Sequence, residues 1–373
     1  MRIKTTAPTV LISTVILVIC TCGFIGQQLS GGLIESVEES RFELMRSILA
    51  STLADTESKA LARAELVAAL PNIGGLLRAA DRSGLQAETA TLFAAQRDRF
   101  GLSQAQFFVP PTTSFLRLNL PEKFGDDVSS FRPMVVEWSK TGESLQGMSI
   151  SRAGPAVFGV ASVKDAQGLV GGFEIGLDIG PVLDGLKSKH GFEAAIFIDE
   201  QPLREVATSL GGDVLSSENR VGKTIRFYTT HLDRLRELVQ DRDLSLGDER
   251  TYVREAGGVA YGVYVTPVKN YAGRPLGMIA LAADFTATRA SAGRTLVWQI
   301  LLTLIGCIMS AALILIVLRG MVQVPLREVG RKFAALAAGD REARIEGTED
   351  MPEELQELAT AHESLRSAKE AES

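Results

Sequence analysis

Two uncharged apolar segments, one near each end of the chain, constrain its fold more than any other feature. Residues 10–25 and 295–318 are mostly Val, Ile, Leu and small side chains, and Arg294 and Arg319 bound the second segment. A helix needs roughly 20 apolar residues to cross a bilayer. The second segment reaches that length, and the first reaches it when counted as residues 8–28. The sequence therefore predicts two transmembrane helices, with everything between them on one side of a membrane.

Positive charges near the two segments predict which side that is. Arg2 and Lys4 precede the first segment, and four basic residues lie between positions 319 and 332, after the second. Because cytoplasmic flanks are enriched in Lys and Arg, we expect residues 1–7 and 319–373 in the cytoplasm and residues 29–290 outside the inner (plasma) membrane. A cleaved signal peptide would also begin with basic residues, but no clear small-x-small cleavage site follows, which favours a retained anchor.

The composition of the chain argues against several functional classes. Its three cysteines, Cys20, Cys22 and Cys307, all lie in the apolar segments, so the extracytoplasmic region is expected to fold without disulfides. A net charge of −6, with no Lys/Arg runs outside the juxtamembrane region, argues against a nucleic-acid partner. The three histidines are not at metal-ligand spacing, and the sequence has no nucleophile elbow. We therefore expect a protein that is not an enzyme and that needs no metal or cofactor.

Two similar stretches indicate an internal duplication between the apolar segments. Residues 163–168 read Val-Lys-Asp-Ala-Gln-Gly, residues 268–273 read Val-Lys-Asn-Tyr-Ala-Gly, and Gly172 and Gly277 follow at the same spacing. Each stretch joins two β-rich runs, at 157–163 and 169–179 and at 261–268 and 276–285. Asp or Asn with Gly between such runs is typical of a β-hairpin. The sequence predicts two related hairpins, although unrelated hairpins would share some of these turn residues.

Helical patterns precede and accompany the hairpins. Residues 33–70 contain no proline and little glycine, with Leu44, Ile48 and Leu53 at helical spacing, and Pro71 ends the pattern. Shorter helices are expected at 85–100, 129–140 and 232–239, and a strand at 105–109. Asp126 and Asp127 precede the helix at 129–140, where they fit an N-cap. The predicted class is α+β: a long helix followed by two mixed modules, between two transmembrane helices.

One stretch of the first module is distinctive enough to identify a family. Residues 106–118 (Gln-Phe-Phe-Val-Pro-Pro-Thr-Thr-Ser-Phe-Leu-Arg-Leu) and 121–132 (Pro-Glu-Lys-Phe-Gly-Asp-Asp-Val-Ser-Ser-Phe-Arg) resemble the membrane-distal part of the double Cache domain of bacterial chemoreceptors and sensor kinases. The resemblance implies two PAS-like modules within residues 29–290, a distal module at about 72–185 and a proximal module at about 190–288.

The segment after the second span resembles a HAMP domain, the four-helix relay of dimeric receptors. Pro325 stands where the family has proline, and Glu354 belongs to a Glu-Glu-Leu-Gln-Glu-Leu run that matches its acidic motif. Two heptad patterns carry the helices: Leu326, Val329, Phe333 and Leu336, then Leu355, Leu358, His362 and Leu365. The resemblance implies a homodimer with HAMP at 319–373. No kinase, cyclase or methyl-accepting motif is present, so we expect a separate cytoplasmic signalling partner or a missing C-terminal output module.

A small-molecule site is predicted in the distal module. Such sites combine apolar walls with a few polar groups that fix the orientation of the ligand, and arginine suits carboxylates and phosphates. Arg132 could instead pair with Asp126 or Asp127, and Glu174 would suit a cationic ligand, so both charge types stay open. The candidate ligand-binding residues are Phe107, Phe115, Arg117, Arg132, Trp138, Arg152 and Glu174, with Phe131 and Phe158 as further aromatic wall residues.

These observations together predict a chemoreceptor-like signal-transducing receptor. A homodimer in the inner membrane would bind a small solute in its outer domain and pass a conformational change to the HAMP domain. Two alternatives are a membrane-anchored adaptor that binds another envelope protein and the sensor half of a histidine kinase or cyclase. A membrane-anchored hydrolase is disfavoured because no catalytic constellation is visible.

Overall fold

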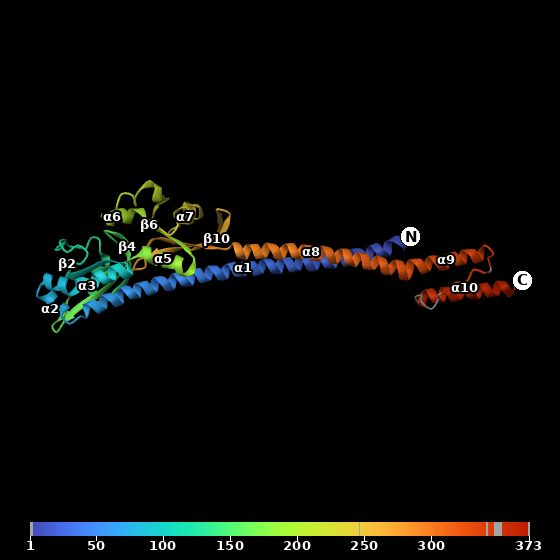
Figure 1. The fold of residues 1–373 in the computed structure, drawn as a ribbon, viewed down its shortest axis with the longest axis horizontal. Helices are drawn as coiled ribbons and strands as arrows, with labels where there is room; N and C mark the ends of the chain where they lie inside the picture. Colours follow the sequence, from blue (N-terminus) through green and yellow to red (C-terminus); the bar gives the residue numbers. More distant parts are fainter. Residues whose placement is uncertain (1–2, 246, 341, 347–352, 372–373) are drawn as a thin grey trace. The chain divides into compact units, whose positions relative to one another are not determined.

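The structure is a computed structural model that describes residues 3–245, 247–340, 342–346 and 353–371 (Figure 1). These divide into two compact units, one of residues 36–289 and one of residues 1–35 with 290–373. Helix α1 (Ile3–Ala68) and helix α8 (Thr286–Val317) contribute to both units.

The unit of residues 36–289 contains two antiparallel sheets. We call the sheet of β1 to β5 with its helices the first module, and the sheet of β6 to β11 with its helices the second module. The strand orders are β2-β1-β5-β4-β3 and β7-β8-β6-β11-β10-β9. The strands are β1 (Leu102–Val109), β2 (Thr113–Arg117), β3 (Leu145–Ser151), β4 (Gly154–Asp165), β5 (Gly168–Asp178), β6 (Glu193–Asp199), β7 (Arg220–Val221), β8 (Thr224–Thr229), β9 (Arg250–Ala256), β10 (Val259–Lys269) and β11 (Pro275–Asp284).

The predicted hairpins are confirmed, and the sheets match beyond them. The hairpin β4–β5 lies at the centre of the first module and β10–β11 takes the corresponding place in the second. Each sheet also has a register shift at the same point. In the first sheet, Phe115 of β2 has no partner on β1, and Phe108 of β1 pairs with the residue beyond it. In the second sheet, Phe227 of β8 likewise has no partner on β6, and Phe197 of β6 pairs with the residue beyond it. This shared irregularity supports the duplication that the sequence indicates.

One face of both sheets packs against the same helices. Figure 1 shows the part of α1 after residue 36 running beside both modules, with α5 (Ile179–His190) next to it. A single apolar core contains Phe42 and Ala64 of α1, Phe173 of β5 and Ile279 of β11. Gly159 of β4 lies directly against the α1 backbone at residues 60 and 61, so a Cβ at this position would clash with it. The long helix predicted at 33–70 is thus confirmed, and it anchors both sheets.

The opposite face of each sheet has a core of its own. In the first module, α4 (Pro133–Thr141) covers Phe108, Phe158 and Val160, and in the second, α7 (Leu232–Leu238) covers Phe197 and its neighbours. The remaining helices of this unit are α2 (Ile73–Arg78), α3 (Arg82–Phe100) and α6 (Glu200–Val206), with short 3₁₀ turns at Ser217–Asn219 and Asp241–Asp243.

The predicted helix at 129–140 begins later than expected. Pro133 is its first residue, because proline fixes the backbone angle of the first turn and needs no hydrogen-bond acceptor there. The acidic pair is therefore not an N-cap, and that prediction is wrong. Asp127 instead accepts hydrogen bonds from the hydroxyls of Thr112 and Ser129, which fixes the turn before the helix.

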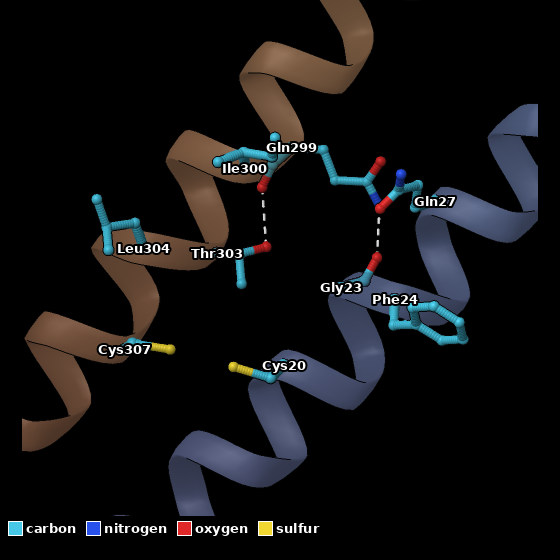
Figure 2. Close-up of a pocket in the computed structure, with 9 residues that line it drawn as sticks. All are labelled: Cys20, Gly23, Phe24, Gln27, Gln299, Ile300, Thr303, Leu304 and Cys307. Carbon is cyan, nitrogen blue, oxygen red and sulfur yellow. Dashed lines mark hydrogen bonds between the residues drawn. The ribbon is translucent and has the colours of Figure 1, made fainter.

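The other unit contains two helical segments that are long and apolar enough to cross a membrane, Leu11–Gln28 of α1 and the part of α8 from Val297 onward. Figure 2 shows where they face each other. The Gln299 side-chain amide donates to the carbonyl oxygen of Gly23 at 3.0 Å. Nearby, the thiols of Cys20 and Cys307 point toward each other (Figure 2). A cavity of about 350 Å³ lies among these residues.

Beyond α8, a π-helical turn (Leu318–Gln323) leads into α9 (Val324–Ala337), and α10 (Glu353–Ala371) packs against α9. The ring of Phe333 contacts the edge of His362 at 4.8 Å between centroids. Leu355 is buried, but Leu358 and Leu365 are 44% and 55% exposed. The apolar residues predicted to share one face of α10 therefore lie on two different faces of the helix. Pro325 lies in the first turn of α9, whereas the side chain of Glu354 lies outside the described residues.

Candidate functional site

A buried ion pair lies between the first sheet and α4. Arg132, directly before α4, donates from Nη2 to the Glu174 carboxylate on β5. The two side chains are only 4% and 2% exposed. The Arg132 guanidinium also lies over the ring of Phe158, 3.9 Å from its centroid. Arg132 therefore pairs with Glu174 and not with Asp126 or Asp127, the partners considered from the sequence.

The alternation of β5 explains why Glu174 faces this layer. Phe173 belongs to the core beside α1, so Glu174 and its neighbours two residues away face α4. Those neighbours are glycines. A Cβ at Gly172 would lie 2.7 Å from the Trp138 ring, and one at Gly176 would lie 2.6 Å from the Phe158 ring. The glycines admit two large aromatic rings, which enclose the carboxylate.

Further donors on this side are left without partners in the described structure. Arg132 Nη1, Gln106 Nε2 and Ser114 Oγ are all buried, and none has a hydrogen-bond partner among the described residues. Gln106 lies opposite Glu174 in the β1–β5 register. Buried donors normally find an acceptor. We call Gln106, Ser114, Arg132 and Glu174 the polar cluster. It contains a buried ion pair and three buried donors that could bind an acceptor on a ligand.

Two other predicted arginines form a separate cluster. Arg117 donates from its two terminal guanidinium nitrogens to the Asp126 carboxylate, at 2.7 and 2.9 Å. The hydrogen bond from Arg117 is the main cause that lowers the pKa of the Asp126 carboxyl below its usual value. Arg152 lies 3.7 Å from the same carboxylate and 4.1 Å from the centroid of the Phe131 ring. These side chains are more exposed than the Arg132–Glu174 pair and brace the loop before α4.

The structure places the predicted aromatic residues on different sides of the first sheet. Trp138 is fully buried beside the polar cluster, and its indole nitrogen donates to the Ser162 hydroxyl at 3.0 Å. Phe107 instead packs on Phe173 in the core beside α1, with ring centroids 4.4 Å apart, so it is not brought together with Arg132. Phe115 is the partly buried residue of the register shift. Gln106 and Ser114, which no pattern in the sequence singles out, join the cluster instead.

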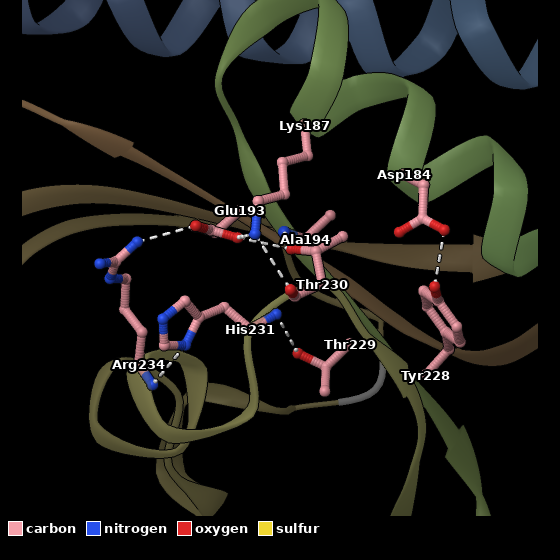
Figure 3. A network of polar contacts seen from close by, with 9 residues as sticks. All are labelled: Asp184, Lys187, Glu193, Ala194, Tyr228, Thr229, Thr230, His231 and Arg234. Atoms are coloured by element: carbon pink, nitrogen blue, oxygen red, sulfur yellow. Dashed lines mark hydrogen bonds and ion pairs between the residues drawn. The ribbon is translucent and has the colours of Figure 1, made fainter.

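The second module contains a polar network of different character, shown in Figure 3. Glu193 on β6 binds Lys187 of α5 at 3.1 Å, Arg234 of α7 at 2.7 Å and the Thr230 hydroxyl at 2.7 Å. Burial raises the pKa of the Glu193 carboxyl, but the hydrogen bonds from Thr230 and Lys187, with the two nearby cations, outweigh burial and lower it. Both carboxylate oxygens are occupied, so this network ties α5 and α7 to the sheet and is already complete.

Two α+β modules in tandem on one long helix, the first with a polar cluster enclosed under a short helix, define a double sensory domain. The chain belongs to that family: residues 35–288 match the double sensory domain of two-component sensor kinases. The double Cache identity expected from the sequence is therefore confirmed, with two sheets and an apolar helix near each end of the chain.

Several solved structures of sensory domains are similar to the chain. The sensory domain of the Campylobacter jejuni chemoreceptor Tlp3 with isoleucine bound has 11% identity and a TM-score of 0.41, covering 70% of this chain and 97% of that one. The sensor domain of the V. cholerae histidine kinase DctB has 12% identity and a TM-score of 0.39, covering 68% and 97%. A domain of a sensory box/GGDEF family protein from Vibrio parahaemolyticus has 12% identity and a TM-score of 0.38, covering 67% and 96%. A comparison with curated proteins gives no match.

Proposed function

We propose that the chain is a non-enzymatic membrane receptor that binds a small solute at the polar cluster of its first module. Membership of a sensory-domain family supports the receptor role. The observation that carries the site is the almost fully buried Arg132–Glu174 pair, beside donors that have no partner among the described residues. Burying two charges is expensive unless their hydrogen bonds are complete, and a ligand would complete them.

The same pair determines which ligand chemistry we propose. A simple anion that captured Arg132 would leave Glu174 buried without a partner, and a simple amine would leave Arg132 in that state. An unpaired buried charge costs several kcal/mol. A zwitterion places its carboxylate on Arg132 and its ammonium group on Glu174, exchanging one internal ion pair for two with the ligand. The proposed ligand is therefore a small amino-acid-like zwitterion, with the rings of Phe158 and Trp138 as apolar walls.

A contact between the modules provides the proposed route for the signal. The backbone nitrogen of Tyr271, in the turn of the β10–β11 hairpin, donates to the carbonyl oxygen of Met148 on β3 at 3.2 Å. Tyr271 also fills the space beside Gly147, where a Cβ would lie 2.7 Å from its side chain. Strand β11 ends at Asp284, and α8 begins two residues later. A ligand that binds one conformation of the first module more tightly would shift this chain of contacts.

In the proposed receptor, residues 319–373 form a HAMP relay in a homodimer. The α9–α10 pair supports this because Leu358 and Leu365 form a second apolar stripe of α10, away from α9. A second copy of the chain would cover that stripe, as heptad helices do in a bundle. Residues 29–290 would lie outside the inner membrane and the HAMP helices in the cytoplasm, where they would act on a cytoplasmic signalling partner.

Calorimetric titration of the purified full chain in lipid nanodiscs tests the ligand class. Amino acids, organic acids and amines are titrated separately. We expect binding by one or more amino acids and loss of binding in Glu174→Gln and Arg132→Gln. The matched control is Arg78→Gln, which removes an exposed arginine that pairs with Asp165 in the same module. Tight binding by a simple dicarboxylate or amine that survives Glu174→Gln would refute the zwitterion proposal.

A further inference from the structure

An arginine in the second module is buried, and two of its nitrogens are unpaired among the described residues. Arg226 on β8 is only 4% exposed, and its Nε and Nη1 atoms have no hydrogen-bond partner in the described part of the chain. Its guanidinium lies 5.8 Å from the centroid of the Phe197 ring. Burial is the main cause that lowers its pKa, followed by the charge of Arg236 on α7. Arginine nevertheless stays protonated in proteins, so this site holds a charge that needs an anion.

The matched registers of the two sheets relate this position to the polar cluster. Phe108 of β1 lies opposite Ser114 in the first sheet, and Phe197 of β6 lies opposite Arg226 in the second, each pair directly after the shared register shift. Phe197 belongs to the core that α7 covers. Arg226 therefore occupies the position that corresponds to Ser114, one of the residues with an unpartnered donor in the first module.

At the position that corresponds to Glu174, the second module has no acid. Two residues before the matched phenylalanines stand Gln106 and Ala195, and their partners on the neighbouring strand are Glu174 and Ala280. The carboxylate of the first module is thus replaced by a methyl group in the second. A cation without a matching acid favours an anion over a zwitterion. The ammonium group of a zwitterion would lie near the positively charged Arg226, with no carboxylate at the position of Glu174 to bind it.

We propose that the second module is a separate binding site in which Arg226 holds the carboxylate of a small organic anion. The guanidinium fork suits a planar carboxylate through two parallel hydrogen bonds. Ala195, Ala280 and Phe197 belong to the same buried core and would supply apolar walls for the body of the ligand. Strand β8 pairs with β6, which pairs with β11, the strand that leads into α8. The site therefore adjoins the element that connects the outer domain to the second apolar helix, independently of the polar cluster.

Thermal unfolding of the full chain in nanodiscs tests the proposal. Acetate, benzoate, phosphate and sulfate are compared with chloride at matched ionic strength. We expect a carboxylate to raise the Tm of the wild type by several degrees at about a hundredfold excess over its Kd. Arg226→Met should abolish this rise. Arg226→Lys keeps the charge but loses the fork, so a reduced response is expected.

The controls separate this site from the polar cluster and from misfolding. Without added anion, Arg226→Met should melt no lower than the wild type, because it removes a buried unpaired charge. The double variant Arg132→Met with Glu174→Leu removes the first site and should keep the full carboxylate response. The inference fails if no carboxylate exceeds chloride in the wild type, if Arg226→Met keeps the response, or if the double variant alone loses it. Protection by phosphate or sulfate, but by no carboxylate, overturns the carboxylate assignment.

Discussion

The buried Arg132–Glu174 pair gives a prediction of definite size. Glu174→Ala leaves the Arg132 side chain, which is only 4% exposed, without its carboxylate, and one of its nitrogens already has no partner among the described residues. Breaking a buried ion pair on one side typically costs about 3–5 kcal/mol. A unit of this length loses roughly 2–4 °C of Tm per kcal/mol, so we expect a fall of about 6–20 °C. Arg132→Ala should have a cost of similar size, since it leaves Glu174 alone.

The double replacement Arg132→Met with Glu174→Leu should behave very differently. Exchanging both charges for apolar groups of similar volume is often neutral or stabilising, so we expect a Tm within a few degrees of the wild type. The two single changes and the double change form a cycle in which the non-additivity measures the pair. The assay is thermal unfolding in nanodiscs, followed by Trp138 fluorescence in a Trp298→Phe background. The reasoning would be refuted if the single variants melt within 2 °C of the wild type, or if the fall in Tm of the double variant equals the sum of the two single falls. Either result would show that water reaches the ion pair.

Four further predictions concern other parts of the chain. Copper–phenanthroline oxidation in membranes should form an intrachain disulfide between Cys20 and Cys307, seen as a non-reducing gel shift that either Ser variant abolishes; absence of the shift would contradict the helix pairing. His362→Leu should raise the melting temperature of the α9–α10 pair, because both ring nitrogens are buried without a partner among the described residues. Gly159→Val should destabilise the outer unit by several kcal/mol, measured by urea unfolding, since the added side chain meets the α1 backbone. The folded-state pKa of Asp243 is lowered, since hydrogen bonds and the charge of a neighbouring arginine outweigh its burial. Its contribution to stability is therefore complete above the unfolded value of 3.8 and is lost as the pH falls through the folded pKa, and Asp243→Asn should flatten that acid limb of the Tm profile.

Local patterns explain which parts of the fold the sequence predicts well. The two central hairpins and the long helix are confirmed. Their signals, which are turn residues and a proline-free apolar stripe, are local and can be recognised within a short stretch of sequence. Strands β3, β6, β8 and β9 were not predicted, since their burial comes from neighbouring strands and from α4 and α7 rather than from a clear alternation. The late start of α4 follows from one residue, Pro133, whose preference for the first helical turn is visible in the sequence.

The site was predicted only in part, because its partners are far apart in sequence. Arg132 and Glu174 are 42 positions apart, and no periodicity links them. One signal was available: Gly172 and Gly176 flank Glu174 at the two-residue spacing of a strand, which indicates that large groups from elsewhere cover that face. Phe107 was grouped with Arg132 because both lie in the predicted distal module, yet strand alternation turns its ring towards α1.

The two modules share one plan but differ in the charge they bury. The first module balances Arg132 with Glu174, whereas in the second Ala280 stands opposite Ala195, the position that corresponds to the Gln106–Glu174 pair. A duplicated module can keep its fold through such exchanges, because the core beside α1 is unaffected by the opposite face of each sheet. The consequence for a receptor is that two ligands of different charge could act on the same β11–α8 connection. If both proposed sites exist, a zwitterion and a carboxylate should each change the other's affinity by the same factor, as linkage requires.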